Sequence, residues 1–122
     1  MLYICNAFSL GMLPEWRLAR SSPATHIGIQ PVSAEQAMAY IHEAEADGHV
    51  VFSAVGHADT ARIFSTLLGG RDVPVNRIGI TLTVSDRYLI GQYLGPRLPE
   101  GVTELPPGAR IAWLVVSLEE AQ

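Results

Sequence analysis

The sequence predicts a mixed α/β domain of α+β character, with helices packed on a mixed β-sheet of about five to six strands. Short apolar runs of strand length alternate with two longer stretches whose apolar residues recur at helical spacing. The order of these segments combines a crossover unit with antiparallel pairs, which is typical of a mixed sheet. The length of 122 residues predicts one domain over residues 1–122.

Six segments have the length and composition of strands. They are residues 2–7, 24–30, 50–55, 77–84, 88–93 and 109–118. The fourth has apolar residues at every second position, and Ser85-Asp86 is expected to turn it into the fifth as a hairpin. Residues 94–108 contain four prolines and three glycines, which predicts a long loop. Loops of this length are usually functional or disordered.

Two helices are predicted. Residues 33–36 match a capping box, and the helix that they begin should run to about residue 46, where Asp47-Gly48 ends it. The second helix, residues 58–68, carries an apolar stripe and stops at Gly69-Gly70. Both helices are expected to pack on the sheet.

Composition excludes several classes of protein. The net charge of −4 argues against a general coat protein of long nucleic acids, but it allows a small anionic ligand in a local pocket. No apolar run approaches the ~20 residues that span a bilayer, and the N-terminus lacks the pattern of a signal peptide. The single cysteine, Cys5, excludes a multi-cysteine metal site. We therefore expect a cytoplasmic protein without a metal, cofactor or membrane partner.

The most informative residue is His57, which follows Gly56 between the strand 50–55 and the helix 58–68. The N–H groups at a helix N-terminus have no partner inside the helix and commonly bind phosphate. A histidine there can donate a proton to a leaving group on a bound phosphate. A histidine after glycine at a turn is more often structural, so its position alone leaves both interpretations open.

Two other segments carry polar groups that a ligand can use. Asn6 and Ser9 follow the first strand, where they either cap backbone groups or present donors to a ligand. If that strand and the strand 50–55 are parallel neighbours, these side chains converge with the helix start. Arg97 and Glu100 lie on the long loop, either as an exposed pair of little consequence or as the charged groups of a lid.

Three segments, in this order, resemble a known family. They are residues 2–13 with Asn-Ala-Phe-Ser, residues 55–60 with Gly-His, and residues 92–101 with Gly-Pro-Arg-Leu-Pro-Glu-Gly. The sequence is similar to the type III anti-CRISPR ring nucleases and related CRISPR-associated ring nucleases. Members of that family degrade cyclic tetra-adenylate without a metal, as homodimers that bind the ring across the interface. Gly11 stands where some members carry a polar Asn, so no side-chain contact is expected from this position.

The resemblance implies a role for seven residues. Those implied in catalysis are His57 as the general acid, with Arg97 and Glu100. Those implied in substrate binding are Asn6, Ser9, Gln92 and Gly56. The implied product is linear di-adenylate with a 2′,3′-cyclic phosphate. Cleavage of the ring would switch off type III CRISPR signalling in the cytoplasm, which is the host's cytoplasm if the protein is viral.

Two other functions stay open at this stage. One is a sensor or sequestering protein that binds the same cyclic oligo-adenylate with little turnover. The other is a dimeric interaction domain whose loops contact protein. The sequence does not distinguish a viral suppressor from a cellular off-switch.

Overall fold

The computed structural model describes residues 1–119. In chain order its elements are β1 (Leu2–Cys5), the 3₁₀ turn η1 (Leu10–Met12), α1 (Glu15–Leu18), β2 (His26–Val32), α2 (Ala34–Ala46), β3 (Val51–Ala54), α3 (Ala58–Leu67), β4 (Arg87–Leu94) and β5 (Arg110–Glu119). The expected mixed sheet with packed helices is confirmed, with five strands.

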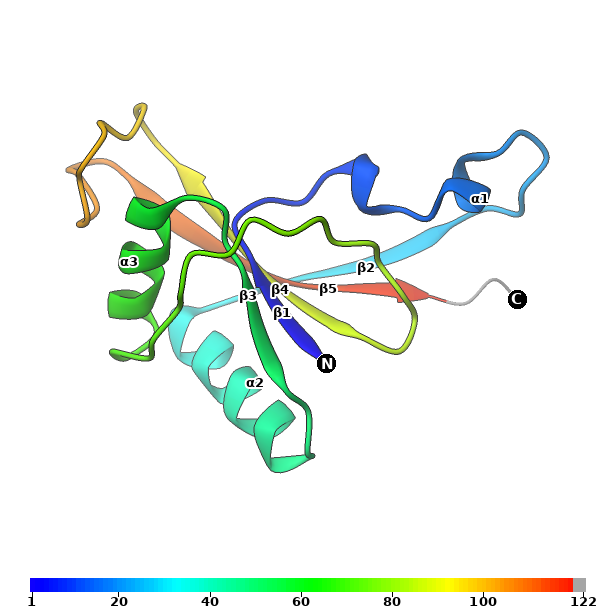
Figure 1. Cartoon of the computed structure of the whole chain (residues 1–122), viewed down its shortest axis with the longest axis horizontal. Helices are drawn as coiled ribbons and strands as arrows, with labels where there is room; N and C mark the ends of the chain where they lie inside the picture. Colours follow the sequence, from blue (N-terminus) through cyan, green and yellow to red (C-terminus); the bar gives the residue numbers. More distant parts are fainter. Residues whose placement is uncertain (120–122) are drawn as a thin grey trace.

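The sheet has the strand order β2-β5-β4-β1-β3. Strand β1 pairs in parallel with both β3 and β4, whereas β5 runs antiparallel to β4 and β2. The three parallel strands β3, β1 and β4 therefore end at the same edge of the sheet (Figure 1). The expected parallel pairing of the first strand with the strand before His57 is confirmed.

Each face of the sheet has its own apolar layer. Helices α2 and α3 cover one face, where buried side chains such as Ile41 and Phe64 pack on Leu2, Ile4 and Leu89 of the sheet. The segments that contain η1 and residues 78–84 lie over the opposite face (Figure 1). Side chains alternate between the two layers along β1 because successive strand residues point to opposite faces.

Helix α2 begins as the sequence predicts. Ser33 Oγ accepts a hydrogen bond from the Gln36 N–H over 3.1 Å, and Gln36 Oε1 accepts one from the Ser33 N–H over 2.8 Å. These bonds satisfy donors that a helix start leaves free. At the other end Gly48 has φ +85°, a conformation that favours glycine.

The predicted strand 77–84 and its hairpin with the next strand are wrong. Residues 77–84 are irregular, and they cross the face opposite the helices, where Leu82 is fully buried and its N–H donates to the Met12 carbonyl over 2.7 Å. Both edges of β4 are already occupied, by β1 and β5, so no position remains beside it. The apolar side chains of this segment, such as Ile80 and Leu82, pack on the sheet face instead.

Strand β4 instead forms its antiparallel pair with β5, across the long loop of residues 95–109. Gly91 in β4 allows the Phe64 and Trp113 rings to pack closely against the backbone of the sheet. A Cβ there would lie 2.5 Å from the Phe64 ring and 2.7 Å from the Trp113 ring. These rings contact each other with centroids 4.9 Å apart, so they need the space that glycine leaves.

Candidate functional site

The carboxyl ends of the parallel strands bring two of the predicted residues to one edge. Cys5, the last residue of β1, pairs with Ala54 on one side and with Ile90 on the other. The half-buried Asn6 follows Cys5 directly, and the half-buried Gln92 lies two residues beyond Ile90 in β4. Ligands of open α/β sheets bind beyond such strand ends.

His57 lies at the same edge, as the N-cap residue of α3. Its backbone is extended (φ −129°, ψ 127°), and its carbonyl accepts the first helical bond from Ala61 N–H over 3.0 Å. Its exposed side chain makes no capping hydrogen bond. Within residues 1–119, no side-chain cap occupies the first N–H groups of α3, so they are available to an anion.

Arg77 also belongs to this edge, and the sequence did not single it out. Its Nε donates to the carbonyl of Gly56 over 2.8 Å, beside the turn into α3. The preceding Asn76 fixes this approach, because its side-chain amide donates to the Ser53 carbonyl and its N–H donates to the Val55 carbonyl, both over 2.8 Å. Because residues 77–84 were predicted to form a strand, the sequence did not indicate this contact between residues 21 apart.

The long loop is attached on both sides of its charged segment. The Tyr93 hydroxyl donates to the Pro96 carbonyl at the start of the loop. The Gly101 N–H donates to Asp59 Oδ2 over 2.7 Å, which ties the loop to the first turn of α3. Between these anchors lie residues 97–100, whose two charged side chains are exposed. Asp59 is a second residue that the sequence did not single out.

Ser9 lies three residues after Asn6, at the N-cap position of η1. It is exposed, and its N–H donates to Met12 Sδ over 3.4 Å. A shallow hollow of about 170 Å³ opens between η1 and the crossing segment. Asn6 lines this hollow together with apolar side chains that include Ile78 and Ile80.

Charges are distributed unevenly between the two ends of the parallel strands. Among residues 1–119, ion pairs join Arg71 to Glu45, Arg87 to Asp47 and the N-terminal amine to Asp86. None of them involves Arg77 or Arg97, which lie at the edge that contains His57. Both side chains are exposed, and the N–H groups that Arg77 does not use on Gly56 are available to an anion, as are those of Arg97.

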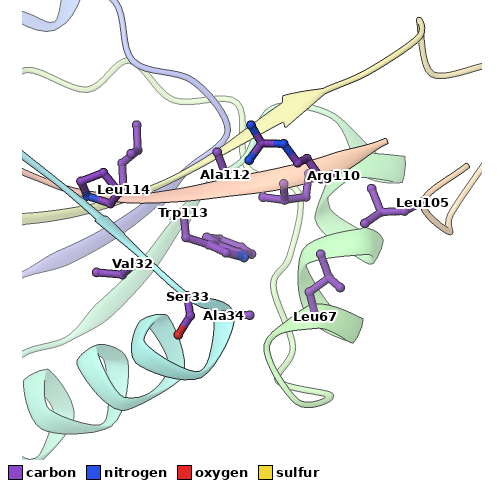
Figure 2. Close-up of a pocket in the computed structure, with 11 residues that line it drawn as sticks. Val32, Ser33, Ala34, Leu67, Leu105, Arg110, Ala112, Trp113 and Leu114 are labelled. Carbon is purple, nitrogen blue, oxygen red and sulfur yellow. The ribbon is translucent and has the colours of Figure 1, made fainter. Parts of the chain in front are cut away.

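A second hollow, of about 360 Å³, lies away from His57 between the start of α2, β5 and the end of α3 (Figure 2). Trp113 and Leu67 line it, Leu105 of the long loop borders it, and Arg110 is its charged residue. None of the predicted site residues lines it. Its lining is mostly apolar, and it forms a seam between the loop, β5 and the helices.

Cys5 lies next to Asn6, but its thiol is buried and unreactive at neutral pH. It is buried in the layer opposite the helices, and burial raises the pKa of its thiol to about 12. The thiol is therefore protonated at neutral pH and is a poor nucleophile.

The described part of the chain holds neither a cluster of metal ligands nor a membrane-spanning helix. Residues 1–119 contain no group of three or more His, Cys, Asp or Glu side chains that could hold a metal ion. Over this range no helix has the length and apolar character needed to cross a bilayer.

The fold and this edge define a small α+β protein with polar and cationic groups gathered where parallel strands end. A family model places it: residues 2–106 match the STIV B116-like family, and the chain belongs to that family. Among solved structures, B116 of Sulfolobus turreted icosahedral virus (STIV) is similar, with a TM-score of 0.70 and 24% identity over 95% of this chain and 97% of that chain. This likeness establishes the fold. No curated protein matches the sequence.

Proposed function

We propose that this protein is a metal-independent ring nuclease that cleaves cyclic tetra-adenylate to linear di-adenylate ending in a 2′,3′-cyclic phosphate. Such an activity would switch off type III CRISPR signalling, in the cytoplasm of a cell or of an infected host. The proposal is carried by the gathering of Asn6, Gln92 and His57 at one sheet edge, to which the long loop is tied. The resemblance of three segments to the ring nucleases supplies the substrate.

The reaction needs one proton donor and a fixed geometry. The 2′-oxygen of one ribose attacks the adjacent phosphorus, the bond from phosphorus to the 5′-oxygen breaks, and His57 donates a proton to that 5′-oxygen. The proton of the 2′-hydroxyl passes to solvent, which also reprotonates the exposed His57 ring. General acid catalysis contributes about 10²–10⁴-fold to such a rate, and in-line positioning of the attacking oxygen contributes further.

The edge also offers the charge that a phosphodiester requires. The first N–H groups of α3 and the guanidinium groups of Arg77 and Arg97 can stabilise the negative charge that develops on the phosphoryl oxygens. Glu100 is assigned to proton handling or to positioning of the ribose. A net acidic protein can bind an anionic ring in this way because the positive field is local.

A homodimer completes the proposal. Cyclic tetra-adenylate repeats the same unit four times, so two copies related by a two-fold axis would present two equivalent sites to one ring. The ring would then lie across the interface and be cut at two opposite phosphodiesters, which gives two di-adenylates.

The test is a product assay with cyclic tri-, tetra- and hexa-adenylate in the presence of a chelator. We expect wild-type protein to convert the tetra-adenylate ring to the 2′,3′-cyclic phosphate product, and His57→Ala to lose about 10²–10⁴-fold in rate. The matched control is His42→Ala, on the exposed side of α2. An unchanged rate for His57→Ala would rule out the general-acid role.

The alternative proposal is a protein that binds cyclic oligo-adenylate with little turnover. One observation favours it: within residues 1–119, no hydrogen bond orients the His57 ring. Catalytic histidines usually have a partner that sets their tautomer. Incubation with excess ring separates the two functions, because a sequestering protein leaves the ring intact while calorimetry still records binding.

A further inference from the structure

The long loop meets α3 through one side-chain hydrogen bond among the described residues. It joins the Gly101 N–H to Asp59 Oδ2 over 2.7 Å, between residues 42 apart in the sequence. Asp59 is the second residue of α3 and lies two residues after His57, while Glu100 directly precedes Gly101. The bond therefore links the two segments immediately beside their functional side chains.

The apolar packing between the loop and α3 is discontinuous. Leu98 and Leu105 pack against the helix-side core, but a hollow of about 160 Å³ remains between the loop and α3. The seam of about 360 Å³ lies on the other side of Leu67 and Leu105. These hollows interrupt the apolar contact between the loop and the helix. A directional polar contact is then needed to define its position.

The two anchors of the loop differ in what they can fix. The hydrogen bond from Tyr93 to the Pro96 carbonyl spans three residues, so it shapes the start of the loop without attaching it to another element. The bond from Gly101 to Asp59 connects the loop to the helix. Gly101 has φ +82°, which favours glycine, and the turn that presents its N–H is thus encoded locally.

We propose that Asp59 is a positioning residue, whose carboxylate holds the loop at the start of α3 so that Arg97 and Glu100 face the phosphate site at His57. Its role in the reaction rests on the proposed ring nuclease function, whereas its hold on the loop is a property of the free protein. Charge strengthens this contact, because a hydrogen bond to a carboxylate is roughly twice as strong as a neutral one.

Three variants test the proposal. Asp59→Ala removes the acceptor, Asp59→Asn keeps an acceptor oxygen without the charge, and Asp72→Ala removes an exposed carboxylate just beyond α3 that makes no described hydrogen bond. Hydrogen–deuterium exchange of the free protein is the first readout. We expect faster exchange across residues 97–105 in Asp59→Ala, a smaller increase in Asp59→Asn, which keeps the acceptor but loses the charge, and no change in Asp72→Ala.

The second readout is the kinetics of ring cleavage. Misplacement of catalytic groups by about 1 Å can cost roughly a hundredfold, so we expect kcat/KM to fall about tenfold to a hundredfold in Asp59→Ala. Most of the fall should appear in kcat, and Asp59→Asn should stay within about threefold of wild type. An equal loss in Asp72→Ala would show a general charge effect and overturn the proposal.

The outcomes for the two proposals are separable. Unchanged exchange in Asp59→Ala overturns the anchoring of the loop, whatever the kinetics. Faster exchange with unchanged kcat/KM in an active enzyme overturns the positioning role. A wild-type protein that cleaves no ring overturns the ring nuclease function and the positioning in catalysis, while the exchange data still decide whether Asp59 holds the loop.

Discussion

The charged side chains at the two ends of the parallel strands β3, β1 and β4 differ, because those at the amino ends are paired and the arginines at the carboxyl ends are not. At their amino ends the N-terminal amine lies 3.4 Å from Asp86, and Arg87 lies 3.8 Å from Asp47. At their carboxyl ends Arg77 and Arg97 are exposed and, within residues 1–119, have no carboxylate partner. Exposed pairs contribute little to stability, whereas unpaired cations beside a helix N-terminus are available to an anion.

The difference supports the proposed site, because the exposed arginines without a carboxylate partner lie at the end that contains His57. Both ends belong to the same strands and share the same core, so packing does not distinguish them. The chain that surrounds them differs, because the turn into α3 and the long loop lie at the carboxyl ends (Figure 1). The paired charges lie at the amino ends.

The largest expected effect is a loss of affinity for cyclic tetra-adenylate when an arginine at the carboxyl ends, but not at the amino ends, is replaced. A hydrogen bond to a charged group contributes about 1.5–3 kcal/mol, so Arg77→Ala and Arg97→Ala should each weaken binding of cyclic tetra-adenylate about tenfold or more. Calorimetry in a His57→Ala background measures this without turnover. Arg87→Ala is the matched control and should leave affinity unchanged; an equal loss there would remove the distinction between the ends.

The next effect concerns the core beneath the carboxyl ends. Gly91→Ala places a methyl group against the Phe64 and Trp113 rings at 2.5 and 2.7 Å. Overpacking of this kind costs about 1–3 kcal/mol, which urea unfolding would measure. Gly79→Ala is the control, since nothing lies within 4 Å of a Cβ at that position. Equal stability of the two variants would show that the rings move aside freely.

The smallest effect at neutral pH concerns the thiol at the carboxyl end of β1, because its influence on stability develops only above about pH 9. Burial raises the pKa of Cys5 from 9.0 to about 12, so the folded protein keeps a proton that the unfolded chain loses above about pH 9. The resulting stabilisation is fully present below about pH 9 and is lost as the pH rises toward about 12. The folded thiol should also resist alkylation at neutral pH.

The measurement for Cys5 is urea unfolding from pH 8 upward in wild type and Cys5→Ala. Burial also raises the pKa values of Tyr40 and Tyr88, which gives a pH dependence of the same sign. The difference in the free energy of unfolding between wild type and Cys5→Ala, followed against pH, gives the contribution of the thiol. A thiol that reacts rapidly in the folded protein would place Cys5 among the available groups of the site.

The candidate site was only partly predictable from the sequence. Asn6 and His57 follow apolar strands, and the rule that ligands bind at strand ends placed them together once the strands proved parallel. Arg77 and Asp59 were not predictable, because their contacts with Gly56 and Gly101 join residues 21 and 42 apart. No local pattern reports such contacts.

The strand predicted over residues 77–84 shows the same limit for the fold. Alternating apolar residues indicate that one side of a segment is buried, but not whether its backbone pairs with a strand. Here β1 and β5 occupy both edges of β4, so the segment covers a face and its backbone bonds to Met12.

By itself, the sequence determined the features of this protein that local contacts set, such as helix starts, helix ends and turns. The capping box at Ser33, the glycine at position 48 and the turn before His57 act over a few residues, where backbone sterics and nearby hydrogen bonds decide the conformation. Only the tertiary structure decided the strand order, the crossing segment and the attachment of the loop to Asp59. These depend on which surfaces and edges remain free after the other elements have packed.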